Sequence, residues 1–223
     1  IAIGDLTTVD SSTIEVPDIL TAGWPCQPVS KAGSHGGLND DRWIFDDVID
    51  FIARLESRPT RMVFENVRNL LAHDSGRTAV EVVRQVAALG FDLRWGVLRA
   101  SDAGLPHQRE RFFAVATNSD EPGLQGSEPT QRRHLPPRRY RAAHGHDWGP
   151  FTDAISSWEL TFGEPAPDPL DDKQRLNPVF TEWMLGLPCG WVTDLITTRI
   201  HAFRLLGNSV CPPQAGLALA LLT

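Results

Sequence analysis

The sequence predicts an α/β fold in which strands and amphipathic helices alternate along the first half of the chain. Three observations support this prediction. Short apolar runs with strand character recur between residues 18 and 115, helical patterns separate them, and the composition, 41% hydrophobic and 22% charged, is that of an ordinary globular protein. Strands and helices that alternate in this way favour a parallel sheet covered on both faces.

Four strands are predicted from local composition and alternation, at residues 18–21, 61–64, 93–97 and 111–115. Two helices are predicted between them, because apolar residues recur every three or four positions. The two apolar faces consist of Phe45, Val48, Ile49, Ile52 and Leu55 in the first helix, and of Ala79, Val83, Val86 and Ala87 in the second. Gly90 is a suitable C-terminal stop for the second helix.

The amino-acid composition changes near residue 118. Prolines, glycines and arginines dominate residues 118–172, and this stretch is too long for a simple connection. We therefore predict a core at 1–117, an irregular insert at 118–172 and a segment at 173–223 that returns to the core. The last segment contains a short apolar helix within 176–191 and another that opens at Pro212. No apolar run approaches a membrane span, and residues 1–10 predict no signal peptide.

Charge and cysteine content narrow the possible functions. The formal net charge is −7, so the whole chain is not a generic binder of polyanions. Arginines outnumber lysines 19 to 2, which suits phosphate and base-edge recognition and equally suits a GC-rich genome. The three cysteines are an odd number without metal-type spacing, so we expect a reducing compartment, no disulfide framework and no metal site.

Cys26 lies between Pro25 and the pair Gln27-Pro28, directly after the first predicted strand. That position gives a thiol both access and rigid surroundings, as a nucleophilic thiolate requires. The loop beyond it contains Gly33, Gly36 and Gly37 and is suited to move as a lid. A cysteine with no catalytic role is the alternative interpretation of this motif alone.

Glu65 and Asn66 stand where the second strand ends, and the carboxyl ends of parallel strands form the ligand crevice of such sheets. Glu65, with apolar neighbours Met62, Val63 and Phe64, is a candidate proton donor, because desolvation favours the protonated carboxyl. The alternative is that Asn66 caps the helix that follows.

Arg109 and Arg111 would point the same way at the start of the fourth strand, because strand side chains repeat every two residues. Two guanidinium groups on one face make a clamp for an anion or a carbonyl, whereas the alternative is a pair of surface ion pairs. Gly207, Asn208 and Ser209 precede a proline-started helix and suit either an anion at a helix N-terminus or a plain turn.

In this order, the four motifs resemble those of the cytosine-C5 DNA methyltransferase family: Pro25-Cys26-Gln27, Glu65-Asn66-Val67, Gln108-Arg109-Glu110-Arg111 and Gly207-Asn208-Ser209-Val210. The stretches GDLTTVD at 4–10, ENVRNLLAHDSGRT at 65–78 and RLNPVFTEWMLGLPCGW at 175–191 are also similar to the family. The resemblance covers nearly the whole chain except residues 118–172. It implies a Rossmann-like methyltransferase core.

The resemblance implies roles for the motif residues. Cys26 corresponds to the nucleophile that adds to carbon 6 of a cytosine flipped out of duplex DNA. Glu65 corresponds to the proton donor at ring nitrogen 3, Arg111 to the arginine that holds the cytosine carbonyl, and Arg109 to its companion near the nucleophile. The backbone carbonyl of Trp24 is suited to accept the exocyclic amine. Gln27 and Ser30, in the loop after Cys26, are expected to contact DNA.

The resemblance also implies S-adenosylmethionine as cofactor. Asp5 corresponds to the acidic residue that reads the adenine, while Asn208 and Ser209 correspond to the loop at the methionine end, and Pro25 is expected to contact the cofactor. The family's Gly-rich strand-turn has no counterpart within residues 1–223, so we expect an N-terminally incomplete core. A fragment, a second polypeptide that supplies the start and a degenerate remnant remain open. A bacterial or phage-encoded cytoplasmic protein is expected.

The insert corresponds to the family's target-recognition region. Residues 131–146 carry five arginines and no acidic residue, which predicts a phosphate-binding patch of Arg132, Arg133, Arg138, Arg139 and Arg141. Tyr140 and Trp148 are expected to contact bases, and a disordered basic loop is the alternative.

Two other function classes compete with an enzyme of this family. One is a catalytically inactive remnant or subunit that binds DNA or a partner chain. The other is a thiol hydrolase that uses Cys26 with His35 or His107, for which no orienting third group is evident. The target sequence and the biological role stay undetermined by the sequence.

Overall fold

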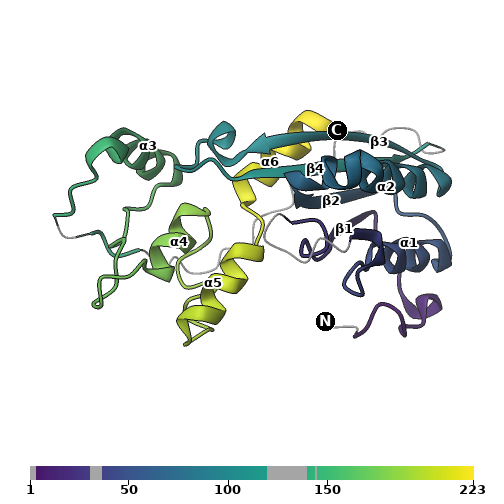
Figure 1. The fold of residues 1–223 in the computed structure, drawn as a ribbon, viewed down its shortest axis with the longest axis horizontal. Coiled ribbons are helices and arrows are strands. Elements are labelled where there is room, and N and C mark those ends of the chain that lie inside the picture. The colour runs from purple at the N-terminus through teal and green to yellow at the C-terminus, as the bar shows by residue number, and fades with distance from the viewer. Residues whose placement is uncertain (1–3, 31–36, 120–139, 144) are drawn as a thin grey trace. The chain divides into compact units, whose positions relative to one another are not determined.

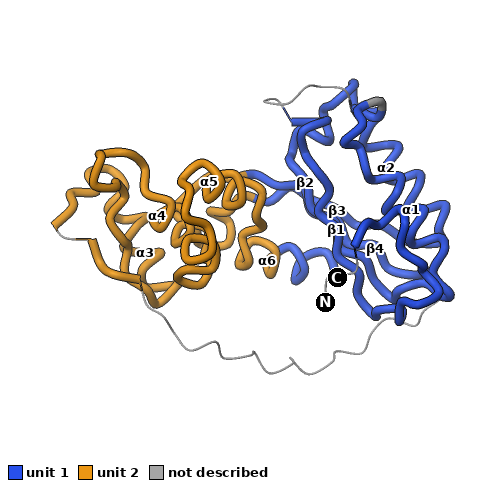
Figure 2. Tube along the Cα trace, turned by 90° about the horizontal axis from the view of Figure 1, so that it is seen from below, with its two compact units in different colours: residues 1–98, 110–127, 218–223 blue, residues 99–109, 128–217 orange. Residues whose placement is uncertain are grey.

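The computed structural model describes residues 4–30, 37–119, 140–143 and 145–223, which belong to two compact units. Unit 1 comprises Ile1–Leu98, Glu110–Ser127 and Ala218–Thr223, and unit 2 comprises Arg99–Arg109 and Glu128–Leu217 (Figure 2). The predicted segments 1–117, 118–172 and 173–223 follow changes in composition and periodicity along the sequence, and they stay predictions.

Unit 1 is built on a four-stranded sheet of order β1-β2-β4-β3 (Figure 1). Its strands are β1 (Ile19–Gly23), β2 (Arg61–Val67), β3 (Phe91–Arg99) and β4 (Glu110–Asn118), so all four predicted strands are present. The predicted parallel sheet is wrong in one respect, because β1 and β2 are parallel whereas β2 and β4 are antiparallel. The connection between β3 and β4 consists of residues 100–109, with one short 3-10 turn. A crossover between parallel strands needs a longer connection, so β4 turns back against β3.

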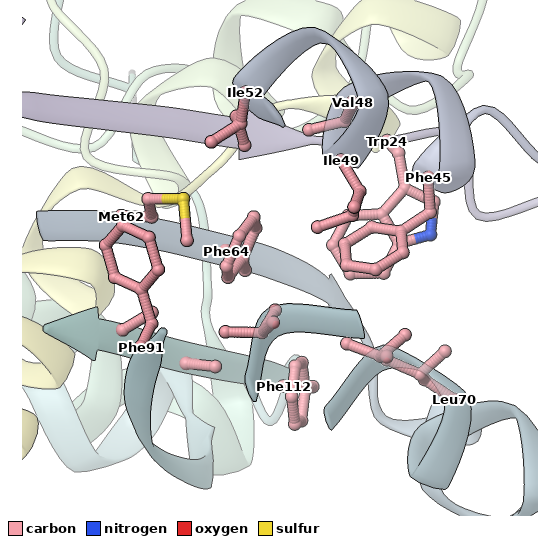
Figure 3. Close-up of a cluster of buried hydrophobic side chains, with 14 of the residues drawn as sticks. Trp24, Phe45, Val48, Ile49, Ile52, Met62, Phe64, Leu70, Phe91 and Phe112 are labelled. Atoms are coloured by element: carbon pink, nitrogen blue, oxygen red, sulfur yellow. The ribbon is translucent and has the colours of Figure 1, made fainter. Parts of the chain in front are cut away.

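One face of this sheet is covered by α1 (Phe45–Arg54) and α2 (Arg77–Ala88), both of which the sequence predicts. Met62 and Phe64 of β2 project toward the apolar side chains of α1, and the rings of Trp24, Phe45 and Phe64 meet among them (Figure 3). Trp24 is 4% exposed, which fixes the start of the loop that carries Cys26. This core therefore holds the carboxyl edge of β1 in place.

The buried face of α2 differs from the predicted one. Thr78, Val82 and Val86 are buried, whereas Val83 is exposed. The helix carries apolar residues on two faces, and Val80 and Val83 line an apolar groove with Trp95 and Phe112 instead of entering the core. Periodicity alone does not choose between two apolar faces of one helix.

Unit 2 has a separate aromatic core, to which α3 (Thr152–Phe162), α4 (Pro178–Met184) and α5 (Arg199–Asn208) contribute side chains. The first half of α6 (Pro212–Leu222) also belongs to this unit. Trp158 and Trp183 are fully buried, and each indole nitrogen donates to a backbone carbonyl. Asn177 caps α4, because its side chain accepts a hydrogen bond from Val179 N at 3.0 Å. The short helix predicted within 176–191 is thus α4.

Residues Arg199–Leu222 are long and apolar enough to cross a membrane, judged by length and composition alone. No such segment was predicted from the sequence. The structure breaks this stretch at residues 209–211 into α5 and α6, of 10 and 11 residues. Each helix is about half the roughly 20 residues that a span requires.

Candidate active site and nucleic-acid interface

Cys26 lies on a tight turn directly beyond the carboxyl end of β1 and is half-buried. Its carbonyl accepts hydrogen bonds from Val29 N at 3.1 Å and Ser30 N at 2.7 Å, so the turn folds back over the cysteine. Pro25 precedes it and limits the backbone further. Because β1 and β2 are parallel, this turn and the end of β2 share one edge of the sheet.

Two side-chain amides, one in β2 and one just after it, hold the Cys26 turn from the side. Asn66 Nδ2 donates to Trp24 O at 3.2 Å, and Asn69 Nδ2 donates to Val29 O at 2.6 Å. The predicted capping role of Asn66 is not observed, because no side chain caps the short turn that begins at Arg68. The Trp24 carbonyl, expected to bind the exocyclic amine of cytosine, already accepts this bond from Asn66.

Gly37 marks the far end of the Cys26 loop and is held by a close contact. Its φ is +56°, and a Cβ atom there would lie 2.5 Å from His73 Cε1, so only glycine fits. Gly37 N also donates to Pro28 O at 3.0 Å. Gly33 and Gly36 of the predicted lid lie outside the described residues. Gly37 therefore anchors the loop at its second end.

Glu65 and Arg111 form an ion pair on the sheet face opposite the helices. Arg111 Nε lies 3.1 Å from Glu65 Oε1, and both side chains are less than one-fifth exposed. The antiparallel register produces the pair: Glu65 faces Phe113, so Arg111 is its diagonal neighbour on the same face. A Cβ atom added at Gly23 would lie 3.7 Å from Glu65 Oε2, so Glu65 is close to the end of β1, where the Cys26 loop starts.

Only part of the predicted apolar surroundings of Glu65 lies on its own face of the sheet. Residues alternate in burial along β2, and Met62 and Phe64 project into the helical core, away from Glu65. A close partner of Glu65 is the charged Arg111. Successive residues on a strand point to opposite faces, so Met62 and Phe64 do not lie beside Glu65, whereas Val63 shares its face. The predicted desolvation of Glu65 stays a prediction.

Arg109 precedes β4, which begins at Glu110, so the two-residue repeat of the strand does not extend from Arg111 to Arg109. Within unit 2, Arg109 Nη2 donates to Gly207 O at 3.1 Å and to Ser209 O. Gln214, fully buried, donates from Nε2 to Arg109 O at 2.9 Å. Arg109 thus ties the third motif to the fourth.

The fourth motif forms the end of a helix, whereas an anion site or a plain turn before the next helix was predicted. Gly207 and Asn208 form the last turn of α5, and Ser209 follows as its C-cap, with Oγ donating to Leu206 O at 2.8 Å. Asn208 is exposed and Ser209 is half-buried. The backbone N–H groups before α6 are therefore only partly available to a ligand.

Asp5, the predicted reader of adenine, lies in an exposed turn of unit 1. Thr7 N and Thr7 Oγ1 donate to Asp5 Oδ1 at 2.9 and 2.8 Å, and these bonds lower the pKa of Asp5. Beside this turn lies a cavity of about 360 Å³ lined by Thr7, Asp47, Asp50, Ala53 and Arg54. Its carboxylates match a ligand rich in donors, such as an adenine amine and ribose hydroxyls.

The residues predicted to contact DNA fall into three groups. Gln27 and Ser30 lie in the Cys26 turn, and Gln27 Oε1 is buried without a hydrogen-bond partner among the described residues. Arg141 is exposed on unit 2. The remaining four, Arg132, Arg133, Arg138 and Arg139, lie outside the described residues.

The two aromatic residues predicted to contact bases have different environments. Tyr140 is 4% exposed, and its hydroxyl donates to Leu187 O at 2.9 Å. The prediction for Tyr140 is therefore wrong: burial raises its pKa and makes it a core residue. Trp148 is half-buried and stacks on Phe180 with ring centroids 5.5 Å apart.

The thiol-hydrolase alternative gains no support from His107. Its Nε2 bonds Met184 O at 3.1 Å, and its Nδ1 accepts from Arg109 N at 3.4 Å, so both ring nitrogens are engaged. His35 lies outside the described residues. In the described part of the chain, no group of three His, Cys, Asp or Glu side chains is placed to hold a metal ion.

Sequence reasoning missed Asn69, Gln214 and Glu182. Glu182 is fully buried and accepts from the backbone N–H groups of Gly190, Val192 and Thr193 at 2.9, 2.6 and 3.1 Å. These bonds hold the backbone of residues 190–193, in the loop after α4, around the Glu182 carboxylate. The signal that could have identified Glu182 is a charged residue within a mainly apolar helix, because a glutamate is rarely buried without partners.

Solved structures of methyltransferases have the same fold as this chain. The S. pombe Dnmt2 methyltransferase matches 98% of the chain and 82% of its own length, with a TM-score of 0.59 and 17% identity. A likeness at that identity concerns the fold alone. Unit 1, with its mixed sheet and flanking helices, thus has the Rossmann-like α/β fold of methyltransferases.

The chain belongs to the C-5 cytosine-specific DNA methylase family, whose family model matches residues 1–146. The Type II methyltransferase M.NlaX of Neisseria lactamica is 28% identical over 94% of the chain and 77% of that protein. M.NlaIV of the same species is 34% identical over 88% of the chain and 54% of that protein. Three further Type II methyltransferases match over 28–37% of their own lengths. The chain thus spans about one-third to three-quarters of these relatives.

Proposed function

We propose that this protein is a DNA (cytosine-5)-methyltransferase that transfers a methyl group from S-adenosylmethionine to carbon 5 of a flipped-out cytosine. One observation carries the proposal: the anchored Cys26 turn and the Glu65–Arg111 pair occupy the same edge of neighbouring parallel strands. Residues from separate motifs thus share the edge of the sheet at which α/β proteins commonly bind ligands, which supports their assignment as nucleophile and base-holding groups.

Cys26 supplies the nucleophile in this proposal. Carbon 5 of cytosine is a poor nucleophile, so a thiolate adds to carbon 6 and shifts electron density onto carbon 5. After the methyl group is gained, loss of the carbon 5 proton to solvent restores the double bond and expels Cys26. The bonds from Asn66 and Asn69 keep the turn in one position, which favours attack at a fixed angle.

Glu65 and Arg111 act on the other side of the cytosine ring. Charge accumulates at ring nitrogen 3 and the neighbouring carbonyl during the addition, and Arg111 is placed to stabilise that charge. Glu65 takes up a proton from solvent when the base replaces Arg111 as its partner, and the protonated carboxyl then donates to nitrogen 3. The ion pair between them orients both groups before the base arrives.

S-adenosylmethionine, when bound, supplies the electrophilic methyl group. Asp5 and the cavity lined by Thr7, Asp47 and Asp50 fit its adenosine part, because carboxylates accept from amines and hydroxyls. Asn208 and Ser209 are assigned to its methionine end, and Pro25 to a contact near the transferred methyl group.

Duplex DNA is the proposed substrate, and a bacterial or phage-encoded cytoplasmic enzyme of restriction-modification type is the proposed setting. The relatives named Type II methyltransferases support both. Gln27 and Ser30 would contact DNA beside the flipped cytosine. The arginines at 132, 133, 138, 139 and 141 would bind phosphates.

A second candidate is a subunit that acts with another polypeptide segment. The free edge of β1 favours it: among the described residues β1 pairs only with β2, and Ile19 is 52% exposed. An open strand edge with an exposed apolar residue invites pairing with further strands. Such strands, on a preceding segment or a second chain, would complete the cofactor site.

The test measures transfer of labelled methyl groups from S-adenosylmethionine to genomic duplex DNA. The chain is assayed alone and together with the polypeptide encoded directly before it. Transfer by wild type and loss of transfer in Cys26→Ser, with DNA binding retained, support the proposal. Full transfer by Cys26→Ser contradicts the assigned nucleophile. Transfer only in the presence of the added segment selects the subunit candidate.

A further inference from the structure

An aromatic pocket in unit 2 is not used by the chemistry described above. It has a volume of about 510 Å³, within the range of about 300–1,000 Å³ typical of ligand sites. Its walls are mainly apolar and include Trp148, Phe151, Ile155, Pro169 and Phe180. All of them belong to one compact unit, so the pocket forms without any contribution from unit 1.

The aromatic walls are arranged as a stacking platform. Phe180 is 7% exposed and supports Trp148 in a nearly parallel stack with an interplanar angle of 16°. His146 contacts the same Trp148 ring at 4.5 Å between centroids. Phe151 is 66% exposed at the pocket mouth. An aromatic ring so exposed adds little to the core, whereas it is well placed to contact a ligand.

The polar rim suits a nucleobase. Asp147 lines the pocket, and its Oδ1 accepts from Gly149 N at 2.9 Å, which orients the carboxylate. Carboxylates accept hydrogen bonds from the exocyclic amines of bases. Arg141 is exposed and lies five residues before His146 in the sequence. It is the last arginine of the arginine-rich stretch, which is suited to bind phosphates of the same DNA strand.

We propose that this pocket binds one unstacked nucleobase of the DNA strand, separate from the target cytosine at the Cys26 turn. Every base has an aromatic face, and stacking on a protein ring needs no particular sequence. A base held here would fix the strand on unit 2 during recognition. This inference rests on the proposed function, because it takes DNA to be the ligand.

The test compares two single strands of equal length, one carrying adenine, guanine and thymine but no cytosine, and one with every base removed. Both have the same phosphates, so their affinity ratio isolates base contacts. Fluorescence anisotropy measures that ratio for wild type, Phe151→Ala and Leu160→Ala. Leu160 is the matched control, since it is 86% exposed on α3 and does not line the pocket.

Wild type and Leu160→Ala are expected to bind the base-containing strand about 5- to 150-fold more tightly, which is the effect of one stacked base. Phe151→Ala should lose most of this ratio and keep its affinity for the base-free strand. An unchanged ratio in Phe151→Ala overturns the inference, as does equal binding of both strands by wild type. Methyl transfer by wild type in either case would leave the proposed function standing.

A competition arm separates the two sources of a base. Deoxynucleoside monophosphates are added to the wild-type complex with the base-containing strand. If they displace the strand only at far higher concentration than a competing strand does, the pocket serves a strand. Displacement by monophosphates at equal concentration would show a free-nucleotide site and would overturn the assignment to DNA.

Discussion

Asn66→Ala tests the clamp on the Cys26 turn. The residue is 2% exposed, and its side chain donates to Trp24 O and accepts from Val67 N at 2.8 Å. Alanine leaves both backbone groups without these partners. A buried polar group that loses its partner costs about 1–3 kcal/mol, and half-buried Val67 recovers part of this from water. We expect a loss of about 2–4 kcal/mol, or a Tm lower by about 4–16 °C in a protein of this size.

Thermal unfolding followed by circular dichroism measures this shift. Asn69→Ala serves as the graded comparison, because its single bond to Val29 O also holds the turn. It should lower Tm about half as far. Asn66→Ala should in addition slow methyl transfer by more than its folded fraction explains, since Cys26 loses its fixed position. An unchanged Tm together with full transfer would refute the clamp.

Three further outcomes are expected. Glu65→Gln keeps the shape but removes the charge facing Arg111, and transfer should fall about 10²- to 10⁴-fold; an unchanged rate would exclude Glu65 from catalysis. Glu182→Gln should destabilise unit 2 by about 3 kcal/mol and speed amide exchange at residues 190–193, because one carboxylate accepts from three backbone N–H groups there; unchanged exchange would contradict that role. Hydrogen bonds from Arg84 and Gln85 lower the pKa of Glu81 to about 2, so their stabilisation is complete above about pH 4.5 and is lost as pH falls toward 2; a carboxyl NMR titration with a midpoint near 4.5 would disprove it.

Local patterns in the sequence predict the strands and helices of unit 1 but not every direction or face. All four strands follow from apolar runs, because strand character is a local property. The antiparallel placement of β4 depends on the turn at Gly104, whose φ is +83°, and no apolar pattern reports that. The second apolar face of α2 is decided by packing, with Val83 exposed.

The candidate site divides in the same way. Cys26 and Glu65 were identifiable because each follows a predicted strand, and strand ends form the ligand edge of an α/β sheet. Asn66 was open to a better prediction: it shares its strand face with Met62 and Phe64, so its amide had to find a buried partner. The bond from Arg109 to Gly207 spans 98 positions of the sequence, a distance at which local patterns carry no information.

The claim that Cys26 attacks carbon 6 of cytosine is tested most directly by trapping the covalent adduct. Duplex DNA in which cytosine carries fluorine at carbon 5 allows the addition, but the carbon 5 proton whose loss releases Cys26 is missing. After methyl transfer the adduct should therefore persist through denaturation. Trypsin digestion should place it on the peptide that ends at Lys31, and Cys26 is the single cysteine of residues 1–31. The account predicts an adduct there in wild type and none in Cys26→Ser. Methylation of ordinary DNA by wild type without any adduct on fluorinated DNA would contradict it.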